Sequence, residues 1–366
     1  MKINILLPYK EKFDKNKASS VSITVKNNLM HTKFLKGIKV YGQYVENALF
    51  KDNFVGLNYS IFSLKSKNTF LLHRMLMMIS KDNSKKQLIE IHNRPYLINQ
   101  ISRRYQFPVS LFFHNDPLTM KGSKSIKDRQ NILEKCAAVF CVSEYIKRQF
   151  MRGITNEKQK VHVLYNGVNR KISNFPEKKK EILFVGRLVS EKGVDLYVEV
   201  AKSIACNYPD WNFGIIGSLR LGDKNKTNSF GNKVIGKFKA IGSQANYYGF
   251  KDYSFVEEKM KTTAIIVIPS IWQEPFGLVA AEAMSNGICI VASEVGGIPE
   301  IIRDNGVLIK NINFQKLKKN LIELINDDEL RNFYQKRAWE DFKFSAESSS
   351  KKLDNFREII LSQNSY

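Results

Sequence analysis

The chain has 366 residues, of which 43% are hydrophobic, and its formal net charge is +23. This length predicts two domains, and no run of 18 or more apolar residues occurs, which argues against a membrane-spanning helix. The opening MKINILLP is too soon broken by proline for a signal peptide, so we expect a first buried strand there. The cysteines lack metal-ligand spacing, and we expect free thiols in apolar surroundings of a reducing compartment for Cys136, Cys141, Cys206 and Cys289.

The positive charge is concentrated in the first half of the chain. Residues 1–170 contain 30 Lys and Arg against 11 Asp and Glu, a net +19, whereas the remaining residues contain 28 against 24, a net +4. Such a field favours anionic partners: lipid headgroups, nucleic acid or a phosphorylated glycan. A lysine-rich solvated face is the alternative, but compositional bias alone should load both halves equally.

Short apolar runs alternate with helix-like stretches along the chain. In the first half we expect strands at 3–8, 38–41, 59–62, 88–92, 109–113 and 138–143. In the second half we expect them at 181–186, 213–217, 247–249, 265–269, 288–292 and 307–309. Strands spaced by helices predict a parallel sheet in each half, with ligands at the carboxyl ends of the strands.

Three further segments concern domain organisation. Residues 70–81, FLLHRMLMMISK, predict a core helix, with partial insertion into a membrane as the alternative. Residues 169–180 are basic, polar and contain proline, which is typical of a linker. Residues 345–361 form a charged, amphipathic helix candidate.

The most informative motif is EPFGLVAAE, residues 274–282, which follows the buried-strand pattern at 264–270. Pro275 and Gly277 indicate a turn, and a helix should begin at Leu278. The first N–H groups of a helix lack intrahelical acceptors and attract anions. Glu274 and Glu282 should lie on the order of 10 Å apart across that helix start. This span suits a nucleotide sugar, because carboxylates accept hydrogen bonds from sugar hydroxyls.

Two cations follow the first strand of the second half. Arg187 comes directly after the strand, and Lys192 stands at the start of the next helix. Together they form a candidate clamp for a diphosphate. No Asp-x-Asp motif occurs, so we expect these cations and the helix dipole, without a bound metal, to stabilise a leaving phosphate.

Several segments together resemble retaining glycosyltransferases of family 4, which have the GT-B fold. They are FCVSEYI at 140–146, VHVLYNGV at 161–168, FVGRLVSEKG at 184–193, VGGIPE at 295–300 and the EPFGLVAAE motif. The resemblance implies two Rossmann-like domains with parallel sheets facing across a cleft. Residues 1–168 would be the acceptor-side domain, with the helix at about 345–366 crossing back to it, and residues 177–344 the donor domain.

The resemblance also implies roles for individual residues. His114 would face the transferred sugar, Arg187 and Lys192 the diphosphate, Glu274 the sugar hydroxyls and Glu282 the ribose. The remaining donor-side candidates are Gly186, Gly217, Ser218, Pro275, Phe276, Gly277 and Leu278. No metal and no cofactor is implied; the donor would be a nucleoside-diphosphate sugar, UDP in preference to GDP. The acceptor would be a glycan or a lipid-linked glycan, and an anionic membrane surface is a candidate partner.

The sequence departs from the family pattern after the first strand. Family members often have a glycine-rich turn there, whereas this chain has NKASS at 16–20, in which a serine could cap the next helix. The weaker acceptor-side candidates are Lys17, Ser19, His92 and Asn115, and His92 equally fits a structural role.

Two other classes of function stay open at this point. One is a catalytically idle, transferase-like scaffold protein. The other is a nucleic-acid-binding protein, for which charge is the only argument, because no nucleic-acid-binding motif is present.

Overall fold

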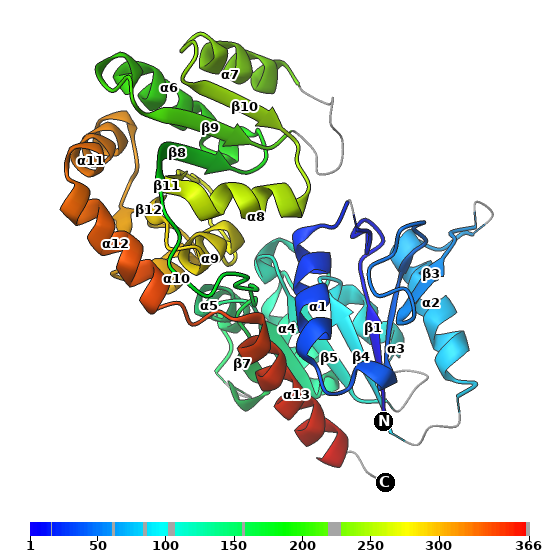
Figure 1. Ribbon diagram of the computed structural model, residues 1–366. Coiled ribbons are helices and arrows are strands. Elements are labelled where there is room, and N and C mark those ends of the chain that lie inside the picture. The colour runs from blue at the N-terminus through cyan, green and yellow to red at the C-terminus, as the bar shows by residue number, and fades with distance from the viewer. Residues whose placement is uncertain are drawn as a thin grey trace. The chain divides into compact units, whose positions relative to one another are not determined.

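The computed structural model describes residues 1–15, 17–60, 63–82, 86–101, 107–155, 158–218 and 228–363. The chain forms two compact units (Figure 1). One contains Met1–Gly167 together with Phe344–Tyr366, and the other contains Val168–Lys343. None of the helices in the described ranges is long and apolar enough to span a membrane.

The first unit is built on a parallel sheet with the order β3-β2-β1-β4-β5-β6-β7. Its strands are β1 Lys2–Leu6, β2 Ile38–Gln43, β3 Phe54–Leu57, β4 Gln87–His92, β5 Val109–Phe113, β6 Ala138–Cys141 and β7 Val161–Val163. Its helices are α1 Ser20–His31, α2 Lys67–Ile79, α3 Ile98–Ile101, α4 Ile126–Lys135, α5 Glu144–Met151 and α13 Ala346–Gln363. β4 is buried along its whole length, as expected for a central strand covered on both faces.

The second unit contains a parallel sheet with the order β10-β9-β8-β11-β12-β13. Its strands are β8 Lys179–Val185, β9 Asn212–Ile216, β10 Ala245–Gly249, β11 Thr263–Ile268, β12 Cys289–Ser293 and β13 Val307–Ile309. Its helices are α6 Val194–Ile204, α7 Ser229–Lys239, α8 Tyr253–Thr262, α9 Leu278–Ser285, α10 Ile298–Ile302, α11 Phe314–Asn326 and α12 Asp328–Glu340. The prediction of two parallel, Rossmann-like sheets is therefore confirmed.

One predicted strand is wrong. The edge strand β3 lies at Phe54–Leu57, not at 59–62, of which residues 61 and 62 lie outside the described residues. Tyr59 instead lies in irregular backbone after β3: its hydroxyl donates to the backbone carbonyls of Ser63 and Lys65, and its ring packs edge-on against Phe70. The aromatic residue thus packs against α2 without being in a strand, although its apolar pattern resembles one.

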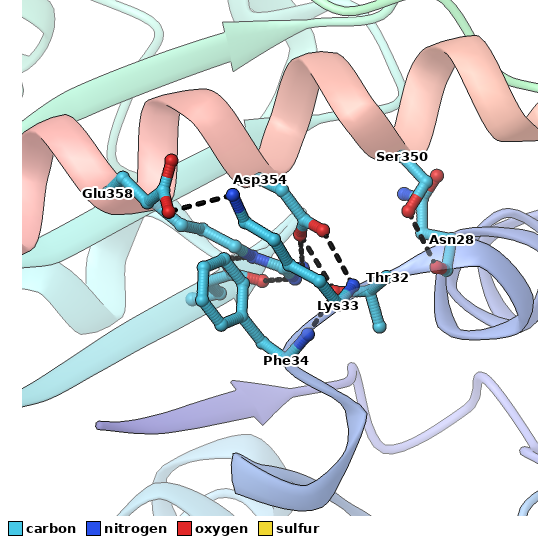
Figure 2. A network of polar contacts seen from close by, with 9 residues as sticks. Asn28, Thr32, Lys33, Phe34, Ser350, Asp354 and Glu358 are labelled. Atoms are coloured by element: carbon cyan, nitrogen blue, oxygen red, sulfur yellow. Dashed lines mark hydrogen bonds and ion pairs between the residues drawn. The ribbon is translucent and has the colours of Figure 1, made fainter.

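The C-terminal helix α13 packs along α1 in the first unit (Figures 1 and 2). Figure 2 shows Asp354 accepting hydrogen bonds from the Thr32 hydroxyl, at 2.7 Å, and from the Lys33 backbone N–H, at 2.9 Å. Beneath these contacts, Arg357 makes a two-pronged ion pair with Glu90 of β4. The last helix is thus tied to the centre of the sheet by a buried charge network.

The expectations for the cysteines and for residues 70–81 had different outcomes. Cys136, Cys141 and Cys289 are buried, but Cys206 is exposed, because it lies in the short turn after α6 that buries Ala205 instead.

The helix α2 is a core helix, with five buried residues from Leu71 to Ile79. Its outer face leaves Met77 and Met78 exposed.

Candidate functional site

The loops that follow β8 and β9 meet at the carboxyl edge of the second sheet. Gly217 has a φ of 150°, and a Cβ there would lie 1.8 Å from the carbonyl oxygen of Gly186. The N–H of Leu188 donates to the carbonyl of Ser218 over 3.1 Å. The structure therefore brings the predicted donor-side residues Gly186, Gly217 and Ser218 together, and only a glycine allows so close an approach of the two backbones.

Lys192 and Glu274 form an ion pair within this unit, although 82 residues separate them in sequence. The Lys192 Nζ lies 2.5 Å from the Glu274 Oε1, and the Ser270 hydroxyl donates to the same oxygen over 2.6 Å. Glu274 is buried, and the ring of Trp272 lies 5.7 Å from the ammonium nitrogen. The cation predicted for phosphate and the carboxylate predicted for sugar hydroxyls thus form one charge-assisted cluster.

Glycines give this cluster its backbone geometry. Gly193, at φ 66°, follows Lys192 directly, and a Cβ there would lie 2.0 Å from the carbonyl oxygen of Pro269. Gly296, at φ 57°, lies equally close to the backbone of Glu274, and the N–H of Gly297 donates to the Glu274 carbonyl over 2.7 Å. The loops after β8, β11 and β12 are therefore locked together around the Lys192–Glu274 pair.

The helix predicted to begin after the Pro275–Gly277 turn is α9, which begins at Leu278 as expected. Gly277 adopts the left-handed conformation at φ 100° and has no side chain with which to cap the first N–H groups. These N–H groups at the helix start are suited to bind an anionic or hydroxyl oxygen. Pro275 and Phe276 are both buried in the turn.

Arg187 differs from the rest of the predicted clamp. Its side chain is exposed and has no ion-pair or hydrogen-bond partner among the described residues. It directly follows the Gly186 turn, on the chain that leads to Lys192. A long cationic side chain in this position is available to an anionic ligand without losing an existing contact.

Glu282 lies in surroundings unlike those of Glu274. It is buried on α9 and hydrogen-bonded to the side chain of Tyr253, at the start of α8. Burial raises the pKa of Glu282 to about 8, the Tyr253 hydrogen bond opposes this rise, and the nearby Glu257 adds to it. Glu282, Tyr253 and Glu257 line one pocket, and Lys171, which also lines it, makes an ion pair with Glu257 at 2.6 Å. The carboxyl group of Glu282 therefore changes from its neutral to its ionised form around pH 8.

In the first unit, the structure pairs two predicted histidines at the ends of β4 and β5. The Nδ1 of His92 and the Nε2 of His114 lie 2.8 Å apart, and the rings stack with centroids 5.1 Å apart. Burial lowers the pKa of His114 to about 4 and holds that of His92 well below its usual value. Asn93, at φ 52°, accepts a hydrogen bond from the backbone N–H of His114 over 2.8 Å. Both rings are therefore neutral at physiological pH.

Of the other acceptor-side candidates, Ser19 makes specific side-chain contacts, whereas Lys17 and Asn115 are exposed. Ser19 caps α1, as expected for a serine in this segment, and its hydroxyl also donates to the carboxylate of Glu11. Burial raises the pKa of Glu11, and the positive charge of Arg94 opposes this rise. Within the described ranges, the side chains of Lys17 and Asn115 contact neither the His92–His114 pair nor the Ser19–Glu11 pair.

Sequence reasoning missed several residues of these groups. Ser270 stands at the end of a recognised strand pattern, so its position at the sheet edge could have identified it. Asn93 follows His92 directly, and asparagine tolerates the left-handed conformation that it adopts here. Tyr253 and Arg94 had no motif signal, because Glu282 and Glu11, with which they interact, are distant in sequence. Glu11 lies in no recognised motif, although its partner Ser19 is only eight residues away.

The sequence of the chain matches two protein-family models. Residues 167–341 match the model of the glycosyl transferases group 1, and residues 46–171 match that of glycosyltransferase family 4. An uncharacterised glycosyltransferase of Methanocaldococcus jannaschii is 33% identical over 254 residues, which cover 66% of this chain and 67% of the relative.

Solved structures show the same fold. A sucrose-phosphate synthase from Thermosynechococcus elongatus has a TM-score of 0.78 at 16% identity, covering 99% of this chain and 100% of that one. The Anabaena protein HepE, solved with UDP and glucose, has a TM-score of 0.74 at 15% identity and covers 97% of this chain and 98% of that one. With both family models matched and two parallel-sheet units in place, the chain belongs to glycosyltransferase family 4 and has the GT-B fold.

Proposed function

We propose that this glycosyltransferase moves a hexose from a nucleoside-diphosphate sugar to a glycan or lipid-linked acceptor in cell-surface polysaccharide or lipopolysaccharide synthesis. We assign UDP as the nucleotide, the one bound in the structurally similar Anabaena protein. The observation that carries the proposal is the Lys192–Glu274–Ser270 cluster beside the start of α9. The cluster supports the proposal because a cation suited to phosphate, a carboxylate suited to sugar hydroxyls and a helix start lie together at one sheet edge.

The proposed reaction retains the configuration of the anomeric carbon. The acceptor hydroxyl oxygen forms a bond to that carbon on the face from which the phosphate leaves, and the bond from carbon to phosphate oxygen breaks. The hydroxyl proton passes to the departing phosphate. Arg187 and Lys192 stabilise the negative charge that develops on the nucleoside diphosphate, so the step needs no metal ion.

The ion pair with Glu274 gives Lys192 a second role before the donor arrives. A buried carboxylate without a partner is costly, so the ammonium group stabilises Glu274 in the free enzyme. A sugar hydroxyl that donates to Glu274 can take over part of this role. Lys192 can then turn towards the diphosphate, which lies nearer the Gly186–Gly217 turn in this proposal.

Substitution of the two cations tests the assignment. Arg187→Ala and Lys192→Ala should each lower turnover about 10²- to 10³-fold, the scale measured for loss of one charge-stabilising donor. Lys237→Ala is the matched control, because Lys237 makes only an exposed ion pair with Glu199. Normal turnover in the Arg187→Ala/Lys192→Ala double variant would refute the clamp.

The two glutamates should separate in a binding experiment. Glu282→Ala should weaken binding of UDP itself, because we assign Glu282 to the ribose. Glu274→Ala should leave UDP binding intact and damage sugar transfer. Isothermal titration with UDP, followed by transfer assays, measures both effects. Equal weakening of UDP binding by both substitutions would show that the direction assigned to the donor is wrong.

We also propose that the first unit docks on an anionic membrane surface that carries the acceptor. The net +19 of residues 1–170 supports this, as do the exposed Met77 and Met78 on the same helix as Arg74. Attraction through dispersed lysine and arginine side chains requires no deep insertion of α2, whose other face is part of the core.

A further inference from the structure

The buried contact between His92 and His114 has a consequence for the chemistry of His114. We infer that His92 is a positioning residue that holds His114 in one neutral tautomer, with its Nδ1 presented as a hydrogen-bond acceptor to a substrate hydroxyl. This inference rests on the proposed function and on the role at the transferred sugar that the family resemblance implies for His114.

The sheet fixes the two rings relative to each other. His92 ends β4 and is in register with Phe112 of β5, and His114 lies two residues beyond Phe112. Side chains two residues apart project from the same face of a strand, so all three rings gather on one face. His92 stacks on Phe112 with centroids 4.5 Å apart and an angle of 10°, and on His114 at 5.1 Å. His92 is thereby held between two aromatic neighbours and has little rotational freedom.

The 2.8 Å contact between His92 Nδ1 and His114 Nε2 contains one proton. Two protons would point N–H groups at each other, and none would oppose two lone pairs. If the proton belongs to His114, its Nδ1 is a bare acceptor. If the proton belongs to His92, the Nδ1 of His114 must carry a hydrogen and becomes a donor. The direction of this single bond therefore decides what His114 offers to a ligand.

The far side of His92 accommodates a proton on its Nε2. Its Nε2 is enclosed and has no hydrogen-bond partner among the described residues, and the Oδ1 of Asn28 is in the same condition. Both residues line one small cavity, together with Thr24 and Ser349. A water molecule in that cavity would accept from a protonated Nε2 and donate to Asn28 Oδ1, which satisfies a donor and an acceptor at once.

This arrangement also matches the intrinsic preference of imidazole. An isolated histidine side chain slightly favours the proton on Nε2. The chain from His114 Nε2–H to His92 Nδ1, and from His92 Nε2–H through water to Asn28, places both rings in the favoured form. The opposite direction would place both in the disfavoured form. His114 is half-buried, and its Nδ1 has no hydrogen-bond partner among the described residues, so the lone pair on Nδ1 can accept from a ligand.

The tautomer can be measured directly in the intact protein. With 15N-labelled histidine, two-bond proton–nitrogen correlation spectra distinguish protonated from bare ring nitrogens for each of the five histidines. We expect His92 and His114 to show the proton on Nε2. A proton on Nδ1 of His114 would overturn the inference, whatever the enzyme assays show.

Two substitutions of His92 separate positioning from packing. His92→Phe keeps the stacking on Phe112 but removes the acceptor for His114. His92→Asn keeps an amide oxygen near the former Nδ1 position but loses the ring. We expect His92→Phe to lower kcat/KM about tenfold, which corresponds to the loss of roughly one hydrogen bond. The variant should also contain both neutral tautomers of His114. His92→Asn should retain most activity and the His114 tautomer.

The outcomes distinguish this inference from the proposed function. Full activity in His92→Phe, or equal loss in both His92 variants at unchanged thermal stability, would overturn the positioning role. Full activity in His114→Ala, together with the expected tautomer in the wild type, would instead remove His114 from the reaction. If His92→Phe fails to fold, the wild-type spectra and His92→Asn decide the question.

Discussion

Replacing Arg357 should destabilise the first unit more than any surface substitution on the same helix. The Arg357 and Glu90 side chains are 2% and 1% exposed. Two hydrogen bonds join them, Nε to Oε1 at 2.7 Å and Nη2 to Oε2 at 2.9 Å. A third bond of 3.0 Å connects Arg357 to Asp354. Arg357→Ala would leave the Glu90 carboxylate buried without its cation.

The structure sets the size of the effect. Two charge-assisted hydrogen bonds, at about 1.5–3 kcal/mol each, give a loss of about 3–6 kcal/mol. Broken buried ion pairs typically cost about 3–5 kcal/mol, which agrees. Since a domain is stable by only about 5–15 kcal/mol, Arg357→Ala should remove a large share of the free energy of unfolding.

The same helix offers a matched control. Lys33, just after α1, also makes an ion pair with Glu358 of α13, at 2.7 Å, but both side chains are about half exposed (Figure 2). Lys33→Ala should therefore cost only about 0–1 kcal/mol. A second comparison is Glu90→Leu with Arg357→Met, which replaces the pair by apolar groups. This double variant should recover most of the stability lost in Arg357→Ala.

The assay must report on the first unit. The three tryptophans, Trp211, Trp272 and Trp339, all lie in the second unit, so their fluorescence does not follow the first. Urea unfolding by far-ultraviolet circular dichroism, with hydrogen exchange of peptides from α13, gives the required measurement. The reasoning is refuted if Arg357→Ala loses no more stability than Lys33→Ala, or if the apolar double variant is as unstable as Arg357→Ala.

Three further predictions concern the second unit and the charged surface. Because burial raises the pKa of Glu282 to about 8, UDP binding through the ionised carboxylate should strengthen as the pH rises towards 8, by up to about tenfold per pH unit. Glu282→Gln should abolish this pH dependence. A UDP affinity of the wild type that does not change with pH would contradict the prediction. Gly193→Ala should destabilise the second unit and lower turnover, because the new Cβ would meet the Pro269 carbonyl. Gly236→Ala, which has open space around it in α7, should instead stabilise the unit by about 0.5–1 kcal/mol. Equal melting temperatures of the two variants would contradict this prediction. Sedimentation with vesicles should increase with anionic lipid content and collapse at high salt; no binding at low salt would move the acceptor to a soluble glycan.

Local sequence patterns were sufficient for much of this protein. Apolar runs located eleven of the thirteen strands in the described ranges within a few residues, because buried parallel strands need continuous apolar residues, and a twelfth, β7, lies in the family motif at 161–168. The turn at Pro275–Gly277 predicted a helix start at Leu278, since proline and glycine restrict the backbone locally. The missed strand β3 lies at the sheet edge and is only partly buried, so its apolar pattern is weak.

Contacts between distant residues were decided only by the tertiary structure. The sequence marked Lys192 and Glu274 as separate ligand groups, but their ion pair depends on how the loops after β8 and β11 approach each other. Likewise, β4–β5 register brings His92 to His114, and the start of α8 brings Tyr253 to Glu282. Each pair depends on register and loop geometry, which are set by the packing of the whole unit and leave no periodic trace in the residues themselves.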